Sequence, residues 1–126
     1  MTGPIFDTHA HYSVRAFDAD RFALLDSLPA KGVVGVCEQA THSGDAPRVL
    51  ELAHKYPWVV AAIGIHPESL LAPEDCGEEG PAPTVSVYGG DWAAEMKALA
   101  PYYDDPKVVA VGECGLDYHW PVPKDA

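Results

Sequence analysis

Apolar residues gather in four short runs along the chain, and few charged positions interrupt them. Runs of this length and composition are typical of β-strands buried on both faces, as found in parallel sheets. The first run begins at a proline, which suits the start or edge of a strand. The expected strands are Pro4–His9, Val33–Cys37, Trp58–Gly64 and Val108–Gly112.

Segments with helical periodicity separate these runs, so strands and helices are expected to alternate. The predicted helices run from Asp18 or Asp20 to about Leu28, from Asp45 to Pro57, and from Asp91 to about Ala100. Gly32 suits the exit of the first helix, and Pro47 the first turn of the second. The apolar faces are expected at Phe22, Leu25 and Leu28, at Val49, Leu50, Leu52, Ala53 and Tyr56, and at Trp92, Met96 and Leu99. The pattern predicts an α/β fold with a parallel (β/α) repeat.

One segment departs from this alternation. Residues 71–90 combine several prolines and glycines with clustered acidic residues. A loop of this length within a compact domain is either functional or mobile. We expect a long acidic Pro/Gly-rich insertion, more mobile than the strands, within one incomplete domain that spans residues 1–126.

Composition narrows the class of protein. The 126 residues are 48% hydrophobic and carry a formal net charge of −11. This acidity argues against a module that holds DNA through a basic surface, but less against an enzyme that meets phosphate through metal ions. Three cysteines without a CxxC pair suit a reducing compartment. No apolar run approaches the roughly 20 residues that cross a bilayer, and no secretory signal precedes the first strand, so we expect a cytoplasmic protein without membrane contact.

Polar residues follow each predicted strand, where parallel α/β folds place their ligands. Asp7, His9 and His11 alternate along the first strand, and side chains at i and i+2 share a face. Glu113 follows the fourth strand, and His66 the third. Two imidazoles with one carboxylate form a catalytic type of metal shell that leaves positions open for water. The pattern predicts a metal site at this edge of the sheet.

Three motifs carry a resemblance to a known family. "FDTHAHY" near the N-terminus, "AAIGIHP" in the middle and "VAVGECGLDYHW" near the end resemble, in order and spacing, the N-terminal signatures of the TatD family of metal-dependent deoxyribonucleases. The resemblance spans essentially the whole chain. It implies the N-terminal half of a TIM-type (β/α) barrel that hydrolyses phosphodiester bonds of DNA with metal-activated water.

The resemblance also assigns roles to individual residues. It implies that His9, His11 and Glu113 bind metal, that the catalytic Glu113 bridges two ions, and that one or two divalent ions (Mg, Mn or Zn) are the cofactors. Asp7 is expected to be structural or to support a ligand. His66 is expected either to contact the substrate phosphate or to make a buried structural hydrogen bond. Asp117 is expected to contact substrate or to support a ligand.

The barrel of such a family needs more chain than this sequence supplies. A (β/α)8 barrel takes about 250 residues, whereas four strands are predicted here. The family's remaining ligands, two histidines and an aspartate, and its general base lie on later strands. Unpaired strand edges and an uncovered apolar face favour association. We therefore expect a second chain or a homo-oligomer to cover the open barrel, and little nuclease activity from the chain alone.

Two other functions stay open at this stage. The chain could be an inactive or structural half-barrel that self-associates or pairs with a second chain and binds at most one ion. It could also be an amidohydrolase-like enzyme acting on an ester or amide, although the GE-x-GLDY motif fits TatD-like proteins better.

Overall fold

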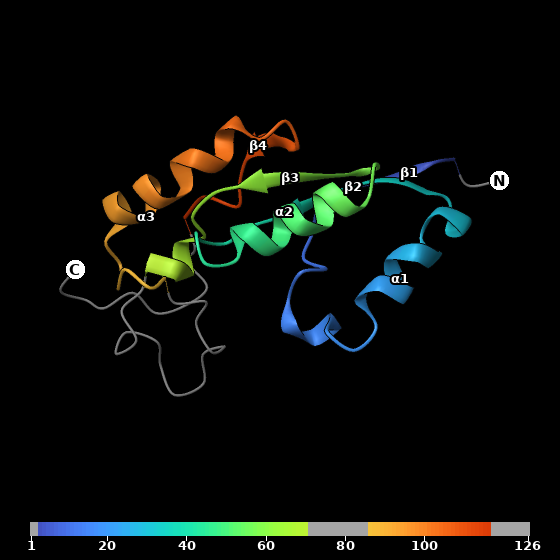
Figure 1. The fold of residues 1–126 in the computed structure, drawn as a ribbon, viewed down its shortest axis with the longest axis horizontal. Helices are drawn as coiled ribbons and strands as arrows, with labels where there is room; N and C mark the ends of the chain where they lie inside the picture. The colour runs from blue at the N-terminus through green and yellow to red at the C-terminus, as the bar shows by residue number, and fades with distance from the viewer. Residues whose placement is uncertain (1–2, 71–85, 117–126) are drawn as a thin grey trace.

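A computed structural model describes residues 3–70 and 86–116, in which strands and helices alternate along the chain (Figure 1). The four strands are β1 (Ile5–Ala10), β2 (Val33–Gln39), β3 (Val59–Ile63) and β4 (Val108–Val111). The α-helices are α1 (Arg21–Ser27), α2 (Ala46–Lys55) and α3 (Trp92–Leu99). Short 3₁₀ helices connect them: η1 (Arg15–Phe17), η2 (Pro29–Lys31), η3 (Pro67–Leu70) and η5 (Ala100–Asp104).

The strands form one sheet in the order β1-β2-β3-β4, and every neighbouring pair is parallel. This order follows the chain, so each connection crosses back to the start of the next strand through a helix. In Figure 1, α2 lies alongside β2 and β3. The predicted parallel (β/α) repeat is confirmed, and β1 and β4 are the edges of the sheet in the described part of the chain.

Side-chain hydrogen bonds and backbone conformation explain where some of the helices begin or end. The Asp91 carboxylate accepts hydrogen bonds of 3.0 Å from the backbone N–H groups of Ala93 and Ala94, which caps α3 as predicted. Gly32 ends η2 with φ of 89°, a left-handed conformation that suits glycine. The predicted Asp45 stands before α2 but does not cap it; its carboxylate accepts hydrogen bonds from the preceding loop instead.

The hydrophobic core lies between the helices and one face of the sheet. Burial of this apolar surface is the main stabilising contribution to such a layered fold. The largest members with almost no exposed surface are Leu25 of α1, Val49 and Leu52 of α2, Leu99 of α3, and Val36, Val59 and Ile63 of the strands.

Burial on both faces, predicted for the four apolar runs, holds largely for β3 but not for the other strands. Val34 of β2 is 57% exposed, and Val109 and Val111 of β4 are 58% and 71% exposed. Val109 and Val111 point to the opposite face from Val108, which packs against the core, and no described element covers them. Val34 lies at a register shift between β1 and β2. The apolar runs therefore predict the strands correctly and their burial only in part.

Two predicted helix faces also differ from the structure. Phe22 is 44% exposed and lies under the Lys55 ammonium, 4.8 Å from the ring centroid, while its neighbour Arg21 is buried. On α3, Trp92 and Met96 are exposed, because Leu99 and Glu95 form the buried side of that helix.

The insertion predicted at residues 71–90 lies largely outside the described residues, since 71–85 are not described. Cys37 and Cys114, the two cysteines that are described, are both free thiols. Within the described ranges, no helix has the length and apolar character needed to cross a bilayer.

The end of β4 passes close over β3 at Gly64. Gly112 donates its backbone N–H to Ile63 at 3.0 Å, and Glu113 donates its own to Ala40, also at 3.0 Å. A Cβ atom at Gly64 would lie 2.6 Å from the Glu113 carbonyl oxygen and 2.7 Å from the Gly112 carbonyl carbon. The missing side chain at Gly64 therefore lets Glu113 cross β3 and reach the end of β2.

We predict that Gly64→Ala destabilises the protein by about 1–3 kcal/mol, the usual cost of overpacking, because its methyl group meets backbone that cannot rotate away. Thermal or urea unfolding measures this loss. Gly112→Ala is the matched control, since its Cβ would meet the Gln39 side chain at 3.1 Å, and a side chain can move. Equal stability of Gly64→Ala and the parent would contradict the argument.

Candidate metal centre

The end of β1 contains a β-bulge at the position of the predicted metal ligands. Asp7 pairs with Val36 and Ala10 pairs with Glu38, so β1 advances three residues while β2 advances two. The extra residue locally interrupts the ladder of backbone hydrogen bonds and turns the strand. Bulges commonly stand beside functional sites, where they redirect a side chain.

Two side chains form hydrogen bonds with backbone groups at this bulge. The Asp7 carboxylate accepts a hydrogen bond from the His9 N–H at 3.2 Å, and the Gln39 amide donates to the Thr8 carbonyl, also at 3.2 Å. Asp7 therefore supports the backbone of His9 and does not join the cluster itself. The predicted role of Asp7, structural or in support of a ligand, stays a prediction.

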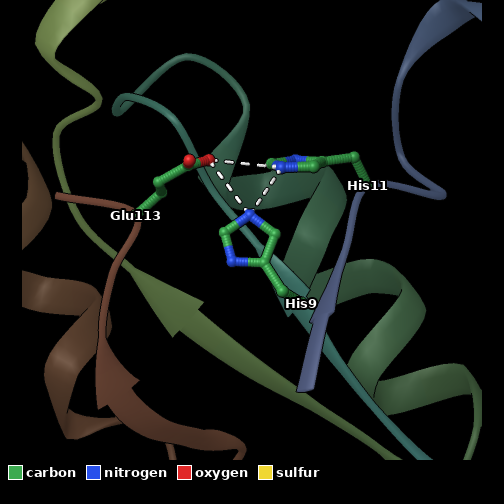
Figure 2. A group of neighbouring side chains, drawn as sticks. All are labelled: His9, His11 and Glu113. Atoms are coloured by element: carbon green, nitrogen blue, oxygen red, sulfur yellow. Dashed lines mark hydrogen bonds and ion pairs between the residues drawn. The ribbon is translucent and has the colours of Figure 1, made fainter. Parts of the chain in front are cut away.

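Three side chains from the two edge strands meet at the carboxyl end of the sheet (Figure 2). The Nε2 atoms of His9 and His11 lie 3.1 Å apart, and each faces Oε2 of Glu113, at 3.4 Å and 3.2 Å. Two ligands that bind one ion at about 2.1 Å are separated by about 3.0–3.4 Å for bond angles of roughly 90–110°. The three donor atoms thus have the spacing of ligands that share one ion.

The cluster is open to solvent on one side. The side chains of His9, His11 and Glu113 are 52%, 32% and 24% exposed. A set of three protein ligands with solvent access is the arrangement of catalytic rather than closed structural metal sites. The donor set, two imidazole nitrogens and a carboxylate oxygen, fits Zn²⁺ or Mn²⁺.

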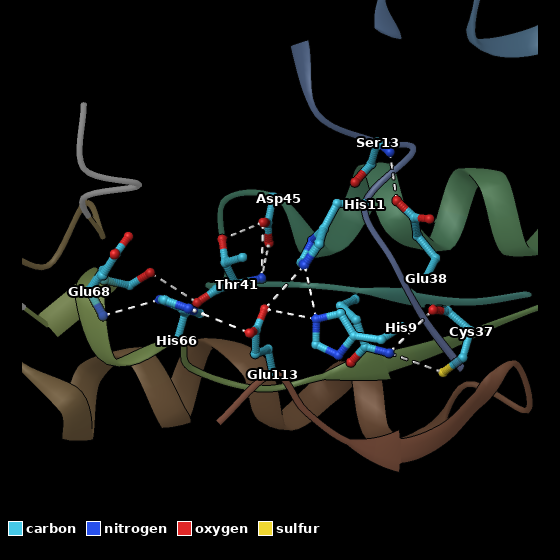
Figure 3. A network of polar contacts seen from close by, with 12 residues as sticks. His9, His11, Ser13, Cys37, Glu38, Thr41, Asp45, His66, Glu68 and Glu113 are labelled. Atoms are coloured by element: carbon cyan, nitrogen blue, oxygen red, sulfur yellow. Dashed lines mark hydrogen bonds and ion pairs between the residues drawn. The ribbon is translucent and has the colours of Figure 1, made fainter. Parts of the chain in front are cut away.

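His66 faces the other oxygen of the Glu113 carboxylate. Its Nδ1 accepts the Glu68 N–H at 3.2 Å, and its Nε2 lies 3.5 Å from Oε1 of Glu113. An Nδ1 that accepts a hydrogen bond carries no proton, so in the neutral ring the proton is on Nε2. His66 therefore directs a donor toward Glu113 (Figure 3).

One further predicted residue is not described, and two other histidines make contacts away from the cluster. Asp117, predicted to contact substrate or support a ligand, lies outside the described residues. His54 pairs with Asp105, at 2.7 Å between Nε2 and Oδ2, near the C-terminus of α2. The His42 ring accepts the Gly44 N–H at 2.8 Å and shapes the loop before α2.

Two buried charged residues beside the site carry no role in the sequence motifs. Glu38 of β2 has no exposed surface, and Arg21 of α1 is 6% exposed. Burial raises the pKa of Glu38. The sequence gives one indication that Glu38 has a specific contact: it is an acidic residue inside an otherwise apolar strand, and such a residue is rarely buried without a partner.

Comparison with known proteins identifies the family. Residues 6–126 match the family described as TatD related DNase. The chain is 34% identical over 96% of its length to the uncharacterized metal-dependent hydrolase YabD of Bacillus subtilis, of which it covers 41%. It is 30% identical over 90% of its length to deoxyribonuclease TATDN3 of Homo sapiens, of which it covers 38%.

A solved structure shows the same fold. The chain resembles the crystal structure of YjjV, a TatD homologue from Escherichia coli, with a TM-score of 0.69 and 28% sequence identity, over 96% of this chain and 39% of that one. The chain thus spans about two fifths of the length of the relatives that it matches. The three motifs, the parallel sheet and the family match agree: the chain belongs to the TatD-related DNase family of metal-dependent hydrolases and nucleases.

Proposed function

We propose that this chain supplies part of a divalent-metal site for the hydrolysis of phosphodiester bonds in DNA. The observation that carries the proposal is the mutual spacing of three donor atoms, one each from His9, His11 and Glu113. DNA as the substrate rests on the family and on the name of the human relative.

Each of these residues has a distinct task in the proposed site. His9 and His11 hold the ion from β1, and Oε2 of Glu113 holds it from β4. When bound, a divalent ion lowers the pKa of water and polarises a phosphoryl oxygen. A second ion would need further ligands from outside the described residues, and the general base would also come from outside them.

His66 is proposed to hold the Glu113 carboxylate in place. Its Nε2–H faces Oε1, so Oε2 remains directed at the two histidines. Partners that orient a metal ligand in this way commonly change metal affinity by about 10- to 100-fold when they are removed. This role differs from a contact with the substrate phosphate, the other role expected for His66.

We predict that His9→Ala and Glu113→Ala each abolish Zn²⁺ and Mn²⁺ binding or weaken it by more than about 100-fold, because either change leaves two donors where the site has three. Isothermal titration and elemental analysis of the purified chain measure it. The control is His54→Ala, which removes an exposed histidine bound to Asp105 away from the site. Unchanged metal content in both site variants would refute the assignment of the ligands.

We predict that His66→Ala weakens metal binding by about 10- to 100-fold in the absence of any substrate, because the Glu113 carboxylate loses its donor. A contact with phosphate alone predicts the opposite pattern, with metal affinity unchanged and KM raised. Metal titration without DNA distinguishes the two roles.

We predict that the 126-residue chain by itself associates in solution and shows little EDTA-sensitive cleavage of single-stranded DNA. Its apolar edge strands are exposed, and exposed edges and patches favour association. Light scattering and a divalent-dependent cleavage assay measure the two properties. A monodisperse monomer with strong cleavage that is abolished by Glu113→Ala would show that these four strands suffice.

A further inference from the structure

Arg21 and Glu38 both bind the short segment that follows His11. The Arg21 guanidinium donates to three successive carbonyl groups, through Nε to Tyr12 at 2.5 Å and through Nη2 to Ser13 at 2.9 Å and Val14 at 2.8 Å. Oε1 of Glu38 accepts the Ser13 N–H at 2.6 Å. Residues 12–14 are therefore held through their backbone, from an α-helix on one side and a strand on the other.

Glu38 occupies a position where an apolar side chain would be expected to stabilise the core more. It lies between Val36 and Ala40, the residues two positions away on the same side of β2, and all three have no exposed surface. The second carboxylate oxygen, Oε2, has no hydrogen-bond partner among the described residues. A buried carboxyl group with one unsatisfied oxygen costs free energy. The hydrogen bond from Ser13, a backbone contact with Tyr12 and the nearby Arg21 charge offset part of this cost.

The segment after His11 has little other support. β1 is an edge strand of the described sheet, it ends at Ala10, and its ladder is already interrupted by the bulge. Beyond that point, the backbone bonds are those from the Val14 N–H to the His11 carbonyl at 3.2 Å and from the Phe17 N–H to the Val14 carbonyl at 3.1 Å, and the Tyr12 ring packs against Phe17. The backbone of His11 is therefore set by how residues 12–14 are held.

We propose that Glu38 is a positioning residue for His11. Glu38 acts through the Ser13 N–H, and together with Arg21 it holds the His11 imidazole at the metal site. This inference rests on the proposed metal site. Figure 3 draws His11 between Glu113 on one side and the Ser13–Glu38 contact on the other. Glu38 touches no donor atom of the site, so its effect is transmitted through two residues of backbone.

The test compares Glu38→Ala with Glu38→Gln in the full 126-residue chain. The alanine variant leaves the Ser13 N–H without its acceptor, and we expect Zn²⁺ affinity to fall by about 10- to 100-fold, as for other partners that support a ligand. The glutamine variant keeps an amide oxygen at the same place, so we expect its affinity to stay within about threefold of the parent. Isothermal titration with Zn²⁺ gives both values.

The control is Val49→Ala, which removes buried volume from the core on α2 and leaves the bonds to residues 12–14 intact. We expect it to lower the melting temperature without changing Zn²⁺ affinity at a temperature where the chain is folded. Loss of affinity in Val49→Ala equal to that in Glu38→Ala would show that Glu38 matters only for stability. Parent-like affinity in a folded Glu38→Ala would also overturn the proposal.

A readout without metal separates this inference from the proposed function. In the metal-free protein, we expect the His11 ring Hε1 resonance to shift in Glu38→Ala and to return in Glu38→Gln. If the parent binds no Zn²⁺, the metal site is wrong, while this shift still tests whether Glu38 positions His11. If Glu38→Ala does not fold, Arg21→Lys replaces it, because a lysine keeps the charge but lacks the planar fork of donors that spans the carbonyl groups of residues 12–14. Unchanged affinity and an unshifted resonance in that variant would refute the proposal.

Discussion

The meeting of Glu113 with His9 and His11 joins the two edges of the described sheet, and much of the structure serves to make it possible. β1 and β4 are separated by three strand spacings, about 14 Å if the sheet were flat, yet the carboxylate oxygen lies 3.4 Å from His9. The passage of Glu113 over Gly64, to a backbone hydrogen bond with Ala40 just after β2, closes much of this distance. The bulge in β1 then directs the imidazoles toward the carboxylate.

Local patterns in the sequence were enough to predict the elements and the three side chains that meet in the candidate cluster. Apolar runs separated by amphipathic segments predicted the strands and helices, because periodicity reports which face an element buries. His9, His11 and Glu113 could be named because strand ends converge in a parallel sheet. The roles of Glu38 and Arg21 were not predicted. Glu38 binds Ser13, which lies 25 positions away, and no local pattern reports a register between strands.

The burial of individual strands was predicted less well, and the reason is physical. An apolar run predicts that its residues are buried in the folded protein, but it does not indicate which element covers them. Val109 and Val111 are apolar and largely exposed here. The chain spans about two fifths of its relatives, and the open side of the sheet and the solvent-exposed donors are both in keeping with a barrel of which four strands are present.

The convergence of donors from the two edges of the sheet has a thermodynamic consequence for the proposed metal site. The proposed donors stand on the first and the last described strand, so the distance between them changes whenever the sheet flattens or tightens. Ion binding and sheet curvature are then reciprocally linked: whatever stabilises the curved form raises the affinity for the ion, and the ion stabilises the curved form by the same free energy. Any contact that fixes the distance between β1 and the end of β4 would change the affinity for the ion in this way, as an effector that works through shape.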